Sequence, residues 1–430
     1  MIGIGVQSRD APHVETDPYR PERDAWAVLA SVHGLGPIGF AALLVRYGSV
    51  QDVLADAARP GAVERLMETP AAEIGVRERP IYEAVAIGIV EAAKSAGRII
   101  GRLRALDVRV VTVEEPGYPV RLAAIAMPPH VLYIRGPLGA LSRERSVAVV
   151  GTRRATSGGR ATAARIATAL VAADASVVSG LAHGIDGAAH EATLRAGGIT
   201  VAVIGGGHAT LGPPSHRRLG EAIIAAGGAV VSEHGPDVIP TQGTFPRRNR
   251  IISGLTDATV VVEAPASSGA LITASWALEQ GRGCYLVPGP IDSRASAGAL
   301  AFLREFAEVT SIVAGVPQLI ADLGFADPPD AGADRLSAAA QQELGRTEAV
   351  VARGLLAGHA TVDELVATTD LPVATVLAAL TLLQRRGLTT GAHGRYRPAG
   401  TLVGEQTSFW RGASDGRSGA VARAGHPLLP

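Results

Sequence analysis

The sequence predicts an α/β protein with a doubly wound, mostly parallel, Rossmann-like sheet, preceded by a helical domain and followed by a winged helix. Between about residues 106 and 323, short Val- and Ile-rich runs alternate with longer Ala-rich amphipathic stretches. Continuous apolar strands separated by helices are typical of a parallel sheet covered on both faces. The expected strands are 108–113, 146–151, 175–180, 200–206, 228–233, 258–264 and 283–288, and helices are expected at 158–173, 186–197, 215–227 and 269–281.

The regions on either side of the sheet follow helical patterns. The Gly-rich turn at 33–39 suits a sterile-alpha-motif-like (SAM-like) or helix-hairpin-helix element, or a plain junction between two helices. Residues 361–398 predict helix, turn, helix and ribbon, which is the order of a winged helix-turn-helix. The expected divisions are a disordered N-terminus at 1–20, the helical domain at 21–100, the sheet domain at 101–323, a linker at 324–340, the winged helix at 341–400 and a disordered tail at 401–430.

Composition restricts the function classes. A single cysteine, Cys284, excludes an intramolecular disulfide framework and favours a reducing cytoplasm. The first residues are too polar for a signal peptide, and no uncharged apolar run reaches the ~20 residues of a membrane span, so a cytoplasmic protein without a membrane partner is expected. With 40 basic and 40 acidic residues the net charge is zero, so any nucleic-acid site must depend on local charge. Lys94 is the only lysine, so arginine carries almost all of the positive charge. Genome composition accounts for this preference for arginine, but arginine is also the better bidentate phosphate ligand.

The first candidate binding loop follows the strand at 146–151. Gly151, Thr152 and Arg153 leave this strand, and a helix begins a few residues later. Glycine permits a tight turn, a helix N-terminus favours an anion, and an arginine holds phosphate through parallel hydrogen bonds. The loop is neither G-x-G-x-x-G nor G-x-x-x-x-G-K-[ST], so dinucleotide and triphosphate sites lack support. A loop with purely structural glycines is the alternative.

A second candidate loop, QGTFPRRNRIISGLTD, places Phe245 among three arginines. Arginines neutralise a phosphate backbone, and an aromatic ring offers a stacking surface worth ~1–3 kcal/mol per base. This combination predicts a site for single-stranded nucleic acid. The alternative is structural, with Arg248 or Arg250 in an internal ion pair with Glu233 or Glu263.

Two further loops follow strands that should end at the same edge. In SGLAHGIDGAAHEATL, Asp186 and His190 share a helix face, but no third ligand at a recognisable spacing completes a metal site. A structural loop without metal or cofactor is therefore expected there. Ser268 and Gly269 open another helix, whose N-terminus can hold a phosphate. Because the carboxyl ends of parallel strands meet at one edge, we expect these loops to converge on one crevice.

In their order, these motifs resemble the DNA-processing protein A (DprA/Smf) family over roughly residues 24–398. The matching pieces are VAVVGTRRAT, SGLAHGIDGAAHEATL, ISGL, VVVEAPASSGALITASWALEQGR and VPGP. The resemblance implies a cytoplasmic, usually dimeric protein that is not an enzyme and needs no cofactor. It implies binding of single-stranded DNA, protection of incoming DNA in natural transformation, and loading of the RecA recombinase.

The resemblance also implies roles for individual residues. Arg153 becomes a principal phosphate ligand, and Phe245 becomes a base-stacking ring. The sequence departs from the family at HATLGPPSH (208–216), where a Tyr-Pro pair is general, at Gln242, where a basic residue is common, and at GALAFL (298–303), which lacks the family's Asn. The implied DNA-binding residues are Gly151, Thr152, Arg153, Ser179, Gly180, Phe245, Arg248, Asn249, Arg250, Ser268, Gly269 and Thr273.

Two other functions compete with strand binding. A nucleotide-binding or nucleoside-monophosphate-hydrolysing enzyme is the alternative, but the P-G-G-x-G-T-x-x-E signature of such hydrolases is absent, and PASSGALITASWALE comes nearest to it. The other competing function is that of a winged helix that binds duplex DNA. Its expected recognition helix, 371–387, is mostly Ala, Leu and Val, whereas reading bases requires polar side chains near the helix N-terminus. A protein–protein or dimer-modulating role is therefore expected for this part.

Overall fold

The computed structural model describes residues 20–71, 79–241, 243–325, 344–392, 394–399 and 402. Gln242 and the predicted segments 1–20, 324–340 and 401–430 lie outside the described residues, apart from residues 20, 324, 325 and 402. The chain divides into two compact units, Met1–Phe325 and Ala326–Pro430.

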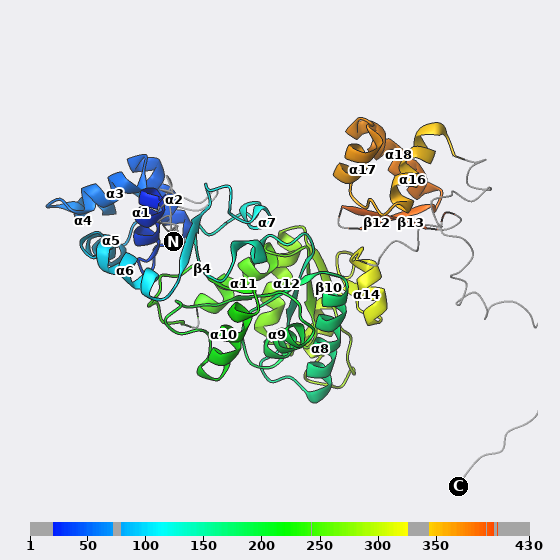
Figure 1. The fold of residues 1–430 in the computed structure, drawn as a ribbon, viewed down its shortest axis with the longest axis horizontal. Helices are drawn as coiled ribbons and strands as arrows, with labels where there is room; N and C mark the ends of the chain where they lie inside the picture. Colours follow the sequence, from blue (N-terminus) through cyan, green and yellow to red (C-terminus); the bar gives the residue numbers. More distant parts are fainter. Residues whose placement is uncertain are drawn as a thin grey trace, which may run out of the picture. The chain divides into compact units, whose positions relative to one another are not determined.

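A nine-stranded sheet forms the centre of the first unit (Figure 1). Its order is β11-β10-β9-β5-β6-β7-β8-β4-β3. Every neighbouring pair from β11 to β8 is parallel, whereas β4 pairs antiparallel with β8 and with β3. The strands are β3 (Arg109–Thr112), β4 (Val131–Arg135), β5 (Ser146–Val150), β6 (Ser176–Ser179), β7 (Thr200–Val203), β8 (Ala229–Ser232), β9 (Ala258–Val261), β10 (Gly283–Leu286) and β11 (Ser311–Ile312). The predicted mostly parallel α/β sheet is confirmed, and β4 and β11 are additions to it.

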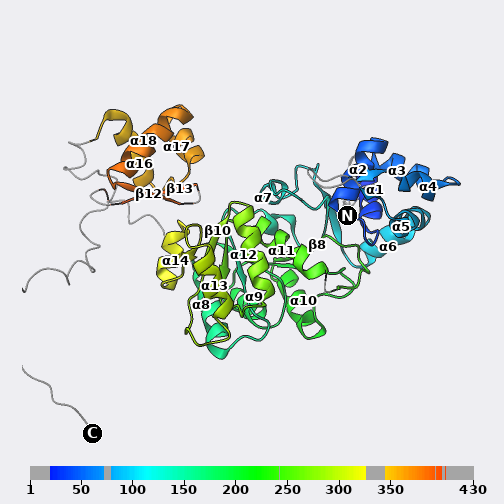
Figure 2. The same cartoon turned by 180° about the vertical axis from the view of Figure 1, so that it is seen from behind.

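Helices cover both faces of this sheet (Figures 1 and 2). Side chains of β5 alternate between two core clusters, with Ala148 and Val150 on one face and Val147 and Val149 on the other, as the period of two in a strand requires. The first face packs against α7 (Val120–Ala123), α11 (Thr244–Gly254), α12 (Gly269–Glu279) and α13 (Ala297–Glu305). The second packs against α8 (Ser157–Ala172), α9 (Ile185–Arg195), α10 (Arg217–Ala225) and α14 (Val316–Asp322).

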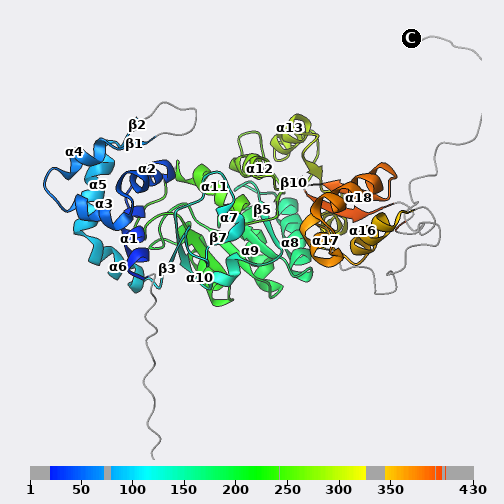
Figure 3. The same cartoon turned by 90° about the horizontal axis from the view of Figure 1, so that it is seen from above.

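Six helices precede the sheet and gather beside its β3–β4 edge (Figure 3). Trp26, Phe40 and Tyr133 share one buried core there, and the Tyr133 hydroxyl donates a hydrogen bond to the carbonyl of Ala27. The helices are α1 (Arg20–Ala30), α2 (Pro37–Tyr47), α3 (Val50–Ala57), α4 (Ala62–Met67), α5 (Glu83–Lys94) and α6 (Ala96–Ala105), with a short hairpin of β1 (Pro70–Ala71) and β2 (Arg79–Pro80) after α4. Their SAM-like or helix-hairpin-helix character stays a prediction.

The second unit contains α16 (Arg346–Leu356), α17 (Val362–Thr369) and α18 (Val373–Arg385), followed by the antiparallel strands β12 (Thr389–Ala392) and β13 (Arg395–Pro398). Thr361 caps α17 by accepting a hydrogen bond from the backbone N–H of Glu364, and this interaction is a sequence-encoded start signal for a helix. The elements follow the expected order, while assignment as a winged helix stays a prediction.

No single helix in the described part of the chain is long and apolar enough to cross a membrane. Only two bent pairs of short helices meet the length and composition of a span when joined, namely Pro37–Tyr47 with Val50–Ala57, and Val362–Thr369 with Val373–Arg385.

Candidate nucleic-acid interface

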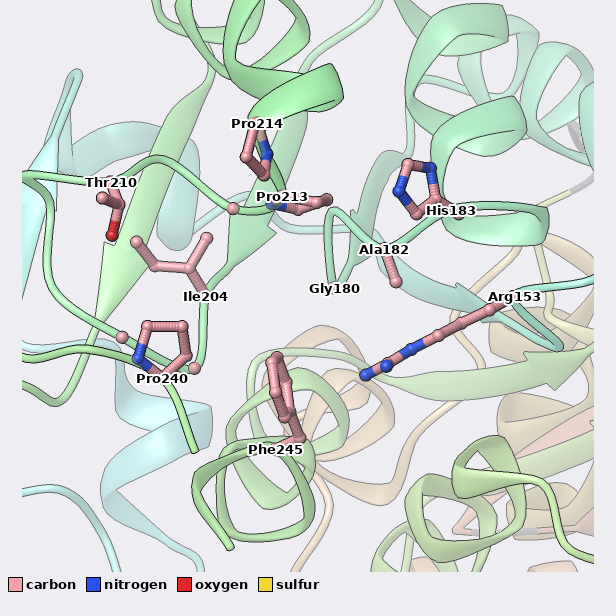
Figure 4. A pocket seen from close by; sticks show the side chains of 13 residues that line it. Arg153, Gly180, Ala182, His183, Ile204, Thr210, Pro213, Pro214, Pro240 and Phe245 are labelled. Carbon is pink, nitrogen blue, oxygen red and sulfur yellow. The ribbon is translucent and has the colours of Figure 1, made fainter. Parts of the chain in front are cut away.

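A cavity of about 210 Å³ opens where β5, β6 and β7 end (Figure 4). Loops after these strands contribute Arg153, Gly180 and Gly205, and the first turn of α11 contributes Phe245. Typical small-molecule pockets hold ~300–1,000 Å³, so this cavity is too small for a whole dinucleotide. The other lining residues are Ala182, His183, Ile204, Gly206, Thr210, Gly212, Pro213, Pro214 and Pro240.

Arg153 and Phe245 face each other in this cavity. The guanidinium carbon of Arg153 lies 4.8 Å from the centroid of the Phe245 ring, which is a cation–π distance. Figure 4 shows the Arg153 side chain extended toward that ring. Arg153 is exposed, and within the described residues it has no ion-pair partner. The pair therefore presents a positioned cation and a half-buried aromatic ring.

Glycine backbone forms the wall behind the ring. A Cβ at Gly205 would lie 3.1 Å from Cδ1 of Phe245, and one at Gly206 would lie 2.7 Å from Cδ of Pro240. Real Cβ atoms are rarely this close to a neighbour, so side chains here would displace the aromatic ring and the proline. Because Gly205 and Gly206 lack side chains, there is room for the Phe245 ring and for the cavity beside it.

Arg248 joins two of the strand ends that border the cavity. It is buried, and its Nη1 donates hydrogen bonds to the carbonyls of Gly180, at 2.8 Å, and of Val203. A Cβ at Gly180 would lie 2.7 Å from both Arg248 Nη2 and Asp186 Oδ2. Burial lowers the pKa of Arg248 to about 10, and burial raises the pKa of Asp186. Gly180 therefore makes room for a buried guanidinium and a buried carboxyl group.

Arg250 is locked in a buried ion pair. Its guanidinium lies 2.7 Å from the carboxylate of Glu233, and its Nε donates to the carbonyl of Met127. Burial by itself would raise the pKa of Glu233, but the Arg250 charge and hydrogen bonds lower it overall. The ion pair between Arg250 and Glu233, one of the structural alternatives that the sequence left open, is present.

These contacts correct the expected lining of the pocket. Arg248, Asn249 and Arg250 are 4%, 8% and 4% exposed, and none of them lines the cavity. Asn249 instead donates from Nδ2 to the carbonyl of Gly269, which joins α11 to α12. The reason is the direction of these side chains, which point from α11 into the core rather than toward solvent. Of the arginines in this segment, only Arg247 is exposed.

The N-terminus of α8 is occupied by the protein's own carboxylate. Glu263 accepts hydrogen bonds from the backbone N–H of Thr156, at 2.9 Å, and from its hydroxyl, at 2.6 Å. A Cβ at Gly159 would collide with this carboxyl group. The sequence predicted a phosphate at this helix end, but Glu263 supplies the anion that the helix N-terminus favours. The same engagement weighs against Glu263 as the base of a nucleotide hydrolase.

The other predicted site residues lie away from the cavity lining. Thr152 donates its backbone N–H to the carbonyl of Glu263, so Gly151 and Thr152 shape the loop that carries Arg153. Ser179 is buried and donates to the carbonyl of Val149. Ser268 caps α12, Gly269 is exposed beside it, and Thr273 is buried in that helix. Of the twelve predicted residues, the cavity therefore contains Arg153, Gly180 and Phe245.

The sequence missed the opposite wall of the cavity. Ile204, Thr210, Pro213 and Pro214 lie after β7, and Pro240 precedes α11. The available signals were the three consecutive glycines that follow this strand and the unusual HATLGPPSH stretch, which turns out to supply part of the lining.

The fold and the cavity define an α/β protein with a mostly parallel core and a candidate binding pocket at the carboxyl ends of its strands. The chain belongs to the DprA/Smf family. The model for DNA recombination-mediator protein A matches residues 109–321. A putative DNA processing protein DprA of Mycobacterium tuberculosis is 39% identical over 306 residues, which cover 67% of this chain and 76% of that protein.

Two further relatives agree with this assignment. The DNA processing protein DprA of Bacillus subtilis is 36% identical over 211 residues, covering 49% of this chain and 71% of that protein. The X-ray structure of DNA processing protein A from Streptococcus pneumoniae superposes with a TM-score of 0.56 at 29% identity, covering 70% of this chain and 97% of that chain.

The buried and the exposed arginines should differ in their effect on stability. Arg250→Gln leaves the Glu233 carboxylate buried without its partner, so the free energy of unfolding should fall by about 3–5 kcal/mol. Arg153→Gln removes an exposed side chain with one cation–π contact and should lower it by no more than about 1 kcal/mol. Urea unfolding followed by circular dichroism measures both variants, and equal losses would contradict the assigned roles.

Proposed function

We propose that this protein binds single-stranded DNA without cleaving it and passes the strand to the RecA recombinase in recombination and natural transformation. The observation that carries the proposal is the exposed Arg153 guanidinium placed 4.8 Å from the Phe245 ring at a small cavity. A single strand offers both groups that this pair binds, a phosphate for the cation and an unpaired base for the ring.

Local charge supports the binding of a phosphate backbone. Arg153 lies close enough to the buried Arg248 for its charge to lower the pKa of Arg248 further, whereas the charge of Asp186 raises it. Arg154 and Arg247 are exposed on the two segments that carry Arg153 and Phe245. Four arginines thus concentrate positive charge at one edge of a protein whose net charge is zero, which favours an anionic polymer there.

The lining favours stacking over recognition of particular bases. Glycine, proline and isoleucine make up most of the wall, and among the described lining residues only Arg153, His183 and Thr210 carry hydrogen-bonding side chains. Base-edge readout requires hydrogen-bonding side chains at fixed positions, whereas stacking accepts every base. We therefore expect little sequence preference. Bases in a duplex are already stacked and paired, so a single strand should bind more tightly.

The remaining parts of the proposal rest on the family. Matching relatives are described as DNA processing proteins, and the matching model as a DNA recombination-mediator protein, which supports a role beside RecA. On the same membership we propose a homodimer, a cytoplasmic location and the absence of catalysis. The engagement of Glu263 by Thr156 favours binding over nucleotide hydrolysis.

Reversing the charge of Arg153 should weaken strand binding. Arg153→Glu replaces a phosphate ligand by a repelling carboxylate, and charge-assisted hydrogen bonds contribute ~1.5–3 kcal/mol, so affinity for an oligo-dT should fall at least about tenfold. A mobility-shift titration measures this change. Arg98→Glu, at an exposed position on α6, is the matched control and should bind normally. Unchanged affinity of Arg153→Glu would remove Arg153 from the site.

Removing the ring should act differently from removing the charge. Phe245→Ala loses a stacking surface worth ~1–3 kcal/mol per base, so affinity should fall about 5- to 150-fold. The slope of log affinity against log salt should stay nearly constant, because that slope reports the phosphates neutralised. Titrations at several salt concentrations measure both quantities. Loss of a phosphate contact in Arg153→Glu should lower the salt slope. A similar drop for Phe245→Ala would show that Phe245 does not act by stacking.

A further inference from the structure

His183 is an exposed side chain at the cavity that the pair of Arg153 and Phe245 leaves unused. It lies two residues before α9 and lines the cavity across from Phe245 (Figure 4). Of the described lining residues, it is the one besides Arg153 whose side chain can carry a positive charge. Histidine ordinarily changes its charge between about pH 5 and 8, so protonation can turn this side chain into an anion ligand.

The loop that carries His183 packs directly against the loop that carries Arg153. The backbone N–H of Ile185 donates to the carbonyl of Thr152 at 3.3 Å. Gly184, between His183 and Ile185, has a φ of +80°, and a Cβ there would lie 2.3 Å from the same carbonyl oxygen. A side chain at this position would push the two loops apart. The glycine therefore lets His183 and Arg153 border one cavity.

The ring of His183 is held by a second segment, the short 3-10 helix η2 (Pro214–His216). Its Nε2 lies 3.3 Å from the hydroxyl oxygen of Ser215, and its ring centroid lies 4.6 Å from that of His216 in an edge-on contact. His216 is itself fixed, because its Nδ1 donates to the carbonyl of Leu181 at 3.1 Å. Ser215 and His216 belong to the HATLGPPSH stretch, in which this sequence departs from its family.

We propose that His183 and Ser215 hold a second phosphate of the strand, next to the phosphate held by Arg153; this inference rests on the single-strand binding proposed above. A protonated imidazole donates from both ring nitrogens and a serine hydroxyl donates one hydrogen bond, and both kinds of donor suit phosphate oxygens. Arg217 and Arg218 follow directly at the start of α10. Both are exposed, and within the described residues neither forms an ion pair. The strand therefore leaves the cavity over η2 toward α10.

Binding at this position should be coupled to protonation. A bound anion favours the charged form of a histidine, so a phosphate at His183 should take up protons and should bind more tightly as the pH falls from 8 to 6. Burial lowers the pKa of His190 to about 3, so His190 stays neutral in this range. The charged or titratable groups packed around the His183 loop are Arg153, His216, Asp186, His190 and Arg248.

The first test follows the affinity of the full-length protein for an oligo-dT against pH and salt. The affinity of the wild-type protein should rise about five- to tenfold from pH 8 to pH 6, and His183→Gln, which stays neutral, should lose most of that rise. At pH 6 this variant should also show a salt slope smaller by about 0.7, the contribution of one phosphate of a single strand. His33→Gln, at an exposed position between α1 and α2, is the matched control and should behave as the wild type. An unchanged pH dependence and slope in His183→Gln would overturn the proposal.

Proton uptake and a rescue variant separate a phosphate contact from a structural role. Calorimetric titrations at pH 7 in two buffers of different ionisation enthalpy count the protons taken up with the strand. The wild-type protein should take up a fraction of a proton that His183→Gln does not. His183→Arg carries a permanent charge, so it should bind at least as tightly as the wild type at pH 8 without that uptake; binding as weak as that of His183→Gln would overturn the assignment.

Failure of this inference can be told apart from failure of the proposed function. A wild-type protein that does not bind the oligo-dT would overturn both. A strand whose affinity depends on Arg153 and Phe245 as expected, but not on His183 at either pH, would overturn the second phosphate position alone.

Discussion

Two buried guanidinium groups hold the site together. Arg248 reaches from α11 to carbonyls at the ends of β6 and β7, and Arg250 pairs with Glu233 just after β8. Moving α11 would leave charges buried without partners, at a cost of several kcal/mol. Phe245 lies three residues before Arg248 on the same face of this helix, so the buried contacts also fix its ring. The ring that faces the exposed cation of Arg153 is therefore held in place.

Arginine side chains thus serve two purposes in this site. Buried arginines position a helix, while the exposed Arg153 remains available for a ligand. The usual anion position of such a fold, the N-terminus of α8 beside the point where the strand order reverses, is closed by Glu263. The open cavity lies instead over β5, β6 and β7, beside Phe245. The helix-end anion site that is usual in nucleotide-binding folds is therefore closed here, and the neighbouring cavity is the place where we propose that a base binds.

Local patterns in the sequence were sufficient for the mostly parallel α/β core but only partly for the site. Continuous Val and Ile runs predicted the parallel strands, because a strand buried on both faces needs apolar residues throughout. An apolar run does not reveal the direction of a strand. The VLYIR sequence of β4 is as apolar as the parallel strands, yet β4 pairs antiparallel with β8. Within PRRNR, Arg248 and Arg250 resemble Arg247 in sequence. Which of them is buried depends on the rotation of α11 and on distant partners such as Glu233 and Gly180, and no local spacing records those contacts.

The central claim is that an unpaired base lies against Phe245. The most direct measurement is photocrosslinking of the full-length protein to an oligo-dT that carries one 5-iodouracil, a base that couples to nearby aromatic rings on irradiation, followed by mass spectrometry of the peptides. Aromatic residues are only 4% of the chain, so a crosslink can be assigned to one ring. We expect the crosslink on Phe245. Crosslinks confined to the N-terminal helices or to the second unit, with Phe245 unmodified, would contradict the proposed site.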